Sequence, residues 1–220
     1  MKESTSREKV LKAIRDALVN PMMPPYVDED YSDRIYIRPE IEYDEVIFAE
    51  ALARVGGQFV YSANENEFAE NIREFLAARD NPCLHCYEDI LQKILNSNNI
   101  FCFNAREELS TCEMGITTCE FLIARLGSIM VSSNQGCGRR GLFWPDIHLV
   151  IAWKDQLVYD LKHGFAALNQ KYKEKGIPSM ITTITGPSRT ADIEKTLVMG
   201  AHGPKELIVF FIDAPYDDEV

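Results

Sequence analysis

The densest group of polar and cationic residues lies between Thr185 and Pro204, in the stretch T-G-P-S-R-T-A-D-I-E-K-T-L-V-M-G-A-H-G-P. A β-branched apolar run precedes it, and the turn pair Gly186-Pro187 would end that strand. Hydroxyl groups, free N–H groups and a guanidinium would then meet at one point, which suits a small anionic ligand. The expected binding loop consists of Thr185, Gly186, Ser188, Arg189, Thr190 and Asp192.

The elements around this loop follow from capping signals. Ser188 or Thr190 would cap a short helix with acidic residues in its first turn, and Gly200 would end it. Residues 207–212 then predict the next buried strand. The loop would therefore lie at the carboxyl end of a strand, where open α/β sheets bind ligands. The alternative is an ordinary strand-to-helix turn in which Arg189 forms a structural salt bridge.

A second candidate is the glycine-rich stretch 136–141, which matches G-x-G-x-x-G letter for letter. The dinucleotide fingerprint needs its last glycine to open a helix, whereas here Pro145 leads towards a strand, so the context excludes it. What remains is a loop that could close over an anionic ligand, or a solvated basic loop. Its candidate contacts are Gly138, Arg139 and Arg140.

Two histidines could exchange protons near neutral pH or could be structural. His148 begins a predicted strand, and His202 lies with Gly203 in the turn before Pro204. His85 and His163 fall in predicted helical stretches and are weaker candidates. Because the chain has no G-x-S-x-G elbow, H-E-x-x-H pair or Walker loop, it indicates a binding surface more clearly than a catalytic set, and we assign no catalytic residue.

Six cysteines raise the question of a metal or a cluster. Cys83 and Cys86 form the only C-x-x-C pair, and no C-x-x-C-x-x-C run occurs. We therefore expect buried free thiols, no metal site and no iron–sulfur cluster held by this chain.

Composition limits the class of protein. The net charge of −11 favours neither a nucleic-acid binder nor a membrane-surface binder. With 220 residues, 46% of them hydrophobic, the chain can build one domain with a substantial core. No apolar run approaches a membrane span and residues 1–20 lack a signal-peptide core, so we expect a cytoplasmic protein.

Periodicity predicts alternating helices and strands, hence an α/β fold with a mostly parallel sheet and helices on both faces. Helices are predicted at residues 6–19, 41–55, 64–79, 87–95, 120–125 and 159–172. Strands are predicted at residues 58–62, 100–103, 115–118, 128–132, 147–153, 179–184 and 207–212.

The expected organisation is an N-terminal helical arm with a proline-rich linker, residues 1–25, followed by an α/β domain, residues 26–220. Residues 26–40 are predicted to be an irregular crossing segment, and residues 213–220 an acidic tail. The arm's apolar stripe would either fold back on its own domain or grip a partner, and the sequence does not decide between them.

Several segments together resemble one family. These are G-I-T at residues 115–117, L-I-A-R-L-G-S-I at 122–129, L-F-W-P-D-I-H at 142–148, and above all G-P-S-R-T-A-D-I-E followed by G-A-H-G-P. They are similar to the LUD domain of the lactate-utilisation family, in its short C-type branch, over roughly residues 41–212. The resemblance implies the fold of the sugar-phosphate isomerases and CoA transferases (NagB/RpiA/CoA-transferase-like). It also implies work in oxidising L-lactate to pyruvate, beside an iron–sulfur subunit and a second subunit that would carry any redox cofactor.

One segment departs from the family pattern. The family reads close to A-E-T-G-T, where residues 124–128 are A-R-L-G-S, so only Gly127 and Ser128 are carried over as ligand contacts. Three hypotheses follow. The chain is a subunit of an L-lactate oxidation system that binds a small anionic ligand, the iron–sulfur subunit, or both. Alternatively it is a stand-alone enzyme acting on a sugar phosphate or CoA ester, or an interaction module whose arm forms a homo-oligomer.

Overall fold

The computed structural model describes residues 6–19, 43–80, 82–104, 113–193 and 196–216. It divides into two compact units, Met1–Glu40 and Ile41–Val220. In the first unit, α1 (Ser6–Val19) is the predicted helix, and its apolar residues Val10 and Ile14 are exposed. The predicted linker, the crossing segment and the last four residues of the tail lie outside the described residues. None of the described helices combines the length and the apolar character that crossing a membrane requires.

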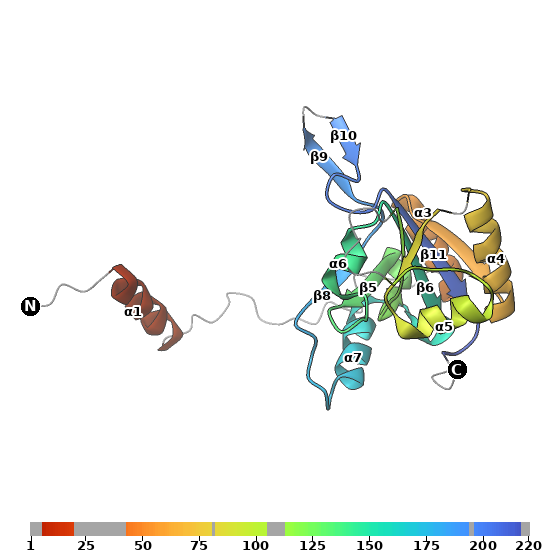
Figure 1. Ribbon diagram of the computed structural model, residues 1–220. Coiled ribbons are helices and arrows are strands. Elements are labelled where there is room, and N and C mark those ends of the chain that lie inside the picture. The colour runs from red at the N-terminus through yellow and green to blue at the C-terminus, as the bar shows by residue number, and fades with distance from the viewer. Residues whose placement is uncertain (1–5, 20–42, 81, 105–112, 194–195, 217–220) are drawn as a thin grey trace, which may run out of the picture. The chain divides into compact units, whose positions relative to one another are not determined.

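The second unit is built on five parallel strands in the order β1-β11-β6-β3-β2, of which β6 and β11 are labelled in Figure 1. In that order the strands span Gln58–Ser62, Glu206–Ile212, Ile147–Trp153, Met114–Thr118 and Leu84–Cys86. β6 and β11 are apolar almost throughout and buried, as expected for central strands covered on both faces. Because all five strands are parallel, their carboxyl ends share one edge of the sheet and their amino ends share the other.

Two helices cover one face of this sheet, α4 (Glu65–Ala77) and α5 (Asp89–Ser97). The Asn64 side chain caps α4 by accepting from the backbone N–H groups of Asn66 and Glu67, at 3.0 and 3.1 Å. The apolar stripe of α4 then meets the sheet, where Phe68 packs edge-on against Phe210.

The opposite face is covered by α3 (Asp44–Arg54), α6 (Gly138–Phe143) and a second sheet of four strands, in the order β7-β4-β5-β8. These strands span Leu157–Val158, Phe121–Ile123, Ser128–Ser132 and Ile181–Ile184. α7 (Leu161–Lys171) packs on the outer side of the second sheet through Leu168. The prediction of an α/β fold with a mostly parallel sheet and helices on both faces is confirmed.

The predicted helix over residues 190–200 is wrong. β9 (Arg189–Ile193) and β10 (Thr196–Met199) form an antiparallel hairpin instead, which projects at the top of Figure 1. Four of the nine residues in the two strands are β-branched (Thr, Ile or Val), and such residues favour extended backbone over a short helix. Capping signals at Ser188 and Thr190 therefore marked the start of a strand.

Four smaller expectations also fail. The predicted helix at 120–125 is β4 followed by a 3-10 turn, Ala124–Leu126, because β4 pairs antiparallel with β5. His85 lies in β2 rather than in a helix, and the predicted strand at 100–103 is reduced to a single bridge between His85 and Phe103. The predicted glycine-rich loop at 136–141 includes the first turn of α6.

Gly127 provides a test of how α3 docks. Its φ is +58°, and a Cβ there would lie 2.7 Å from the Cα of Leu52 in α3. Gly138 is a matched control, since it has the same φ of +58° and open space around it. In urea unfolding, Gly138→Ala should cost about 1–2 kcal/mol of conformational strain. Gly127→Ala should cost roughly 1–3 kcal/mol more from overpacking. Equal losses for both variants would contradict the close approach of α3.

Candidate functional site

A cavity of about 470 Å³ opens where β3 and β6 end. Its walls come from the segments that follow β2, β3, β5 and β6 and from the end of α7. We call it the carboxyl-edge pocket, because parallel α/β sheets bind ligands at this edge. The polar side chains that line it are Glu88, Thr118, Glu120, Asn134, Gln135, Asp155, Gln156, Lys171 and Tyr172. Ile90, Phe121, Trp153 and Tyr216 supply apolar and aromatic surface.

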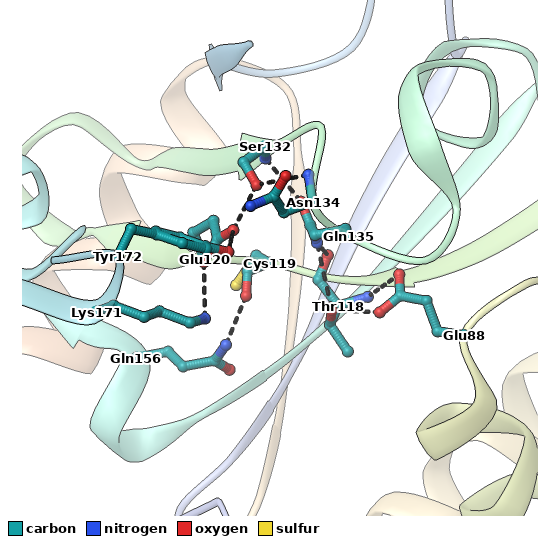
Figure 2. Close-up of polar contacts among 10 residues, drawn as sticks. All are labelled: Glu88, Thr118, Cys119, Glu120, Ser132, Asn134, Gln135, Gln156, Lys171 and Tyr172. Carbon is teal, nitrogen blue, oxygen red and sulfur yellow. Dashed lines mark hydrogen bonds and ion pairs between the residues drawn. The ribbon is translucent and has the colours of Figure 1, made fainter. Parts of the chain in front are cut away.

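Glu88 is the first of two buried carboxyl groups in this pocket. It follows β2, is 6% exposed, and accepts hydrogen bonds from the backbone N–H of Thr118, at 3.0 Å, and from the Thr118 hydroxyl (Figure 2). Burial raises its pKa, and the nearby charge of Glu120 acts in the same direction. Among the residues that the structure describes, no lysine or arginine forms an ion pair with Glu88.

Glu120 is the second, and its surroundings are opposite in character. It is 2% exposed and accepts from Lys171 Nζ at 2.7 Å, Ser132 Oγ at 2.5 Å and Tyr172 Oη at 2.7 Å (Figure 2). Burial alone would raise its pKa, but these donors outweigh burial, so the pKa lies below its ordinary value. Glu120 is therefore a fixed anion at neutral pH.

Two glutamines hold the backbone that carries these carboxyl groups. Gln135 accepts from Ser132 N at 2.9 Å and donates to the carbonyl oxygen of Thr118 at 2.5 Å. Gln156 accepts from Trp153 N at 2.9 Å and donates to the carbonyl oxygen of Cys119 at 2.6 Å. Both amides thus bind the chain on either side of the pocket, and their main role is to fix its walls.

The arrangement can bind and move protons. Two carboxyl groups with pKa values pushed in opposite directions share one cavity, which is the usual arrangement of an acid–base site. Lys171 is half exposed, so its ammonium can bind a ligand anion as well as Glu120. Within the described residues, no group of three or more His, Cys, Asp or Glu side chains could hold a metal ion, and none of the five described cysteines forms a disulfide. Cys112 lies outside that part of the chain.

The residues predicted from sequence lie at the other edge of the sheet. Ser188 N donates to the carbonyl oxygen of Pro204 at 2.8 Å, and Gly200 N donates to the carbonyl oxygen of Ser188 at 2.9 Å. A side chain at Gly203 would meet Ser188 Cβ at 3.2 Å and the carbonyl oxygen of Phe143 at 3.9 Å. The predicted loop, the His202 turn and the end of α6 therefore meet at the amino ends of β6 and β11, and we call this group the amino-edge cluster.

Within the amino-edge cluster, several predicted contacts have structural partners. Arg189 is exposed and donates to the carbonyl oxygen of Val55, at the end of α3. Thr185 Oγ1 lies 2.8 Å from Ser128 Oγ. Gly186 packs on Val55, and Gly127 packs on α3.

The remaining predicted residues lie in several different elements. Thr190 and Asp192 lie in β9, Gly138, Arg139 and Arg140 lie in α6, and His202 is exposed. His148 is fully buried at the start of β6, with Nε2 2.8 Å from Thr117 Oγ1. Burial lowers its pKa to about 4, so this histidine is neutral at physiological pH.

Arg125, where the family pattern has a carboxylate, has a structural partner. Its Nε and Nη2 donate to the two carboxylate oxygens of Asp160, at 2.8 and 3.1 Å. Arg125 lowers the pKa of Asp160, which also caps α7 by accepting from Leu161 N at 2.6 Å. The turn before β5 is thereby tied to the start of α7.

Sequence reasoning missed the carboxyl-edge pocket. The signal was an acidic residue two positions after a strand, which occurs at Glu88 after β2 and at Glu120 after β3. The carboxyl ends of parallel strands meet at one edge, so two such residues would be expected to converge. The signal at Glu88 was not recognised because β2 was not predicted as a strand.

A family model described as the LUD domain matches residues 46–212, which is more than half of the chain. Lactate utilization protein C of Shouchella clausii is 33% identical over 107 residues, covering 49% of this chain and 47% of that protein. The protein of the same name from Geobacillus thermodenitrificans is 32% identical over 155 residues, covering 70% and 62%. The chain thus spans less than half the length of the first relative and less than two thirds of the second.

Two further matches extend over more of the chain. An uncharacterized protein of Neisseria meningitidis serogroup B is 26% identical over 221 residues, covering 94% of each protein. The crystal structure of a DUF162 family protein from Deinococcus radiodurans aligns with a TM-score of 0.55 at 19% identity, covering 77% of this chain and 96% of that one. At that identity the structural match shows the fold alone.

Removing the cation beside Glu120 should destabilise the protein. Lys171→Met leaves a buried carboxylate without its charged donor, and we expect a loss of about 1.5–3 kcal/mol at pH 7 in urea unfolding. Because the folded pKa of Glu120 is lowered, its contribution is present above the pKa of the unfolded chain and is lost as the pH falls through the folded value. The Lys171→Met deficit should therefore shrink on acidification. A deficit that persists in Glu120→Gln protein would show that packing, not the ion pair, is responsible.

Glu88 should behave in the opposite way. Its raised pKa means that the folded protein binds this proton more tightly than the unfolded chain, so stability is lost as the pH rises through the raised pKa. Glu88→Gln, which cannot ionise, should be more stable than the wild type at pH values above the raised pKa of Glu88 and should lose this advantage in acid. Thermal unfolding across the pH range measures the difference. A variant that is less stable at every pH would contradict this account.

Proposed function

The chain belongs to the LUD-domain family, and on that premise we propose that it is a component of a lactate-utilisation system. Within that system, the chain would take part in the oxidation of L-lactate to pyruvate, together with an iron–sulfur subunit and a second subunit that carry the redox cofactor. The names of the Shouchella and Geobacillus relatives support the proposal. A cytoplasmic location, as expected from the sequence, is part of the same proposal.

The observation that carries the ligand assignment is the pair of buried carboxyl groups in the carboxyl-edge pocket. Lys171 supplies one cation there, while Glu88, Glu120 and Asp155 supply three acidic groups. A singly charged hydroxy acid can pair with Lys171 and place its hydroxyl among the remaining groups. The multiply charged phosphates of a sugar phosphate or CoA ester would meet net repulsion in this lining. The pocket therefore favours a small monocarboxylate over the alternative substrates.

A second role concerns the amino-edge cluster, where the sequence places a site for an anionic ligand or a partner subunit. Phe143 and Trp144 are 37% and 55% exposed beside Ser188 and Gly203, with Arg189 nearby. Exposed aromatic residues with an arginine are typical of the energetic centre of protein–protein interfaces. We therefore propose that this cluster receives the iron–sulfur subunit, and that the small ligand binds at the opposite edge.

Genetics and affinity capture test the two roles together. A strain lacking the gene should fail to grow on L-lactate and should be restored by the wild-type chain. Trp144→Ala should reduce capture of the iron–sulfur subunit by roughly tenfold or more, equivalent to about 1.4 kcal/mol or more at an interface centre. Phe165→Ala, at an exposed aromatic residue on α7, is the control and should capture normally.

Two results would count against these assignments. Normal growth of the deletion strain on L-lactate would remove the lactate-utilisation role. Full capture by the Trp144→Ala variant would remove the amino-edge cluster as the docking surface and would leave the metabolic role standing.

A further inference from the structure

We infer that Glu88 is a catalytic residue of the carboxyl-edge pocket, where it accepts the proton of a hydroxyl group on a bound hydroxy acid; this inference rests on the proposed function. The starting observation is a carboxyl group that is 6% exposed, lines a cavity and accepts hydrogen bonds from Thr118 and from the Cys137 thiol, which are uncharged donors. A buried carboxyl without a cation opposes folding when it ionises. Glutamine would fill the same space without the free-energy cost of burying a charge. Packing alone therefore does not explain why a glutamate occupies this position.

The charged and titratable groups around Glu88 do not neutralise it. Glu120 faces it from the connection between β3 and β4, and the Cys137 thiol from the turn before α6. Asp155, after β6, and Lys171, at the end of α7, line the same cavity, and Lys171 already binds Glu120 at 2.7 Å. Asp89, the next residue, is exposed. Of the two buried carboxyl groups, Glu88 is therefore the one that binds a proton more tightly, because its pKa is raised by burial while that of Glu120 is lowered by its donors.

The carboxyl is also held in a fixed position. Thr118 donates from both its backbone N–H and its hydroxyl. Behind the side chain, a Cβ at Gly136 would lie 3.2 Å from Glu88 Cγ, so the turn after β5 leaves little room for the carboxyl to withdraw. Thr118 is therefore a positioning residue, which fixes the direction in which Glu88 can accept a proton.

The two carboxyl groups then have separate roles. Glu120 stays ionised and holds Lys171 and Tyr172 at the wall of the pocket. Lys171 has further N–H groups for the ligand carboxylate, which places the hydroxyl towards Glu88. In the step itself the O–H bond of the ligand breaks, the proton passes to a Glu88 oxygen, and the electron pair stays on the ligand oxygen. No electrons are transferred in this step, and their removal falls to the acceptor in the partner subunits.

The first test measures the proton directly. Protein carrying carbon-13 in its glutamate carboxyl groups is titrated by NMR, as wild type, Glu88→Gln and Glu174→Gln, the last being an exposed glutamate after α7. We expect one carboxyl to titrate well above the others, to vanish in Glu88→Gln and to remain in Glu174→Gln. Ordinary titration of every glutamate, or survival of the high signal in Glu88→Gln, would overturn the inference.

The second test links the proton to turnover. Each variant is expressed in the deletion strain, and L-lactate-dependent reduction of an artificial electron acceptor is measured in the extract across pH. Glu88→Gln should lower the rate by about 100-fold or more, as expected for loss of a general base. Thr118→Val should lower it less and shift the acid limb of the pH profile, while Glu174→Gln should match the wild type.

The outcomes separate the two proposals. If the wild-type extract oxidises L-lactate and Glu88→Gln does so equally well, Glu88 is not catalytic although the lactate role stands. If the deletion strain keeps the full activity, the proposed function fails first. Binding of L-lactate to Glu88→Gln is measured by calorimetry, with propanoate as the control ligand that lacks the hydroxyl group. Retained binding of L-lactate would place the defect of this variant in the chemical step. Loss of binding along with activity would overturn a purely catalytic role.

Discussion

The carboxylate of Glu120 is the constraint on which the candidate site depends. A charge that is 2% exposed has to be matched by donors, and these come from Ser132 at the end of β5 and from Lys171 and Tyr172 at the end of α7. Glu120 itself follows β3 of the main sheet. One buried charge thus ties the main sheet, the second sheet and α7 together, and the space between them is the carboxyl-edge pocket. Packing of the sheets alone would not fix this geometry, since apolar contacts are not directional.

The two edges of the main sheet are built in different ways. At the amino edge, backbone groups meet directly, as in the Ser188–Pro204 hydrogen bond and the close approach of Gly186 to Val55. At the carboxyl edge, side chains bridge a cavity, with glutamines supporting its walls. Close backbone packing leaves an outer surface suited to a protein partner, whereas a cavity with titratable groups suits a small molecule. This contrast is why the ligand and the partner are assigned to opposite edges.

Local signals predicted most of the fold. Asn64 marked the start of α4, and the apolar runs of β6 and β11 were recognised because buried parallel strands are continuous in sequence. The β9–β10 hairpin was missed because Ser188 and Thr190 suit a helix cap and a strand start equally well, and the pairing that decides lies in tertiary structure. The pocket was missed for a similar reason. Glu88 and Lys171 are far apart in sequence, and their convergence depends on a strand order that periodicity does not encode.

The departure of this chain from the family pattern is consistent with the same architecture. Arg125 does not enter the carboxyl-edge pocket but binds Asp160, the residue that caps α7. Because α7 is a single rigid helix, fixing its first turn also fixes where its last turn delivers Lys171 and the following Tyr172. A bidentate arginine–carboxylate pair is directional, so it constrains the helix more tightly than apolar packing does. The substitution therefore supports the helix that supplies the pocket's cation, while the two buried carboxyl groups of the pocket are those of Glu88 and Glu120.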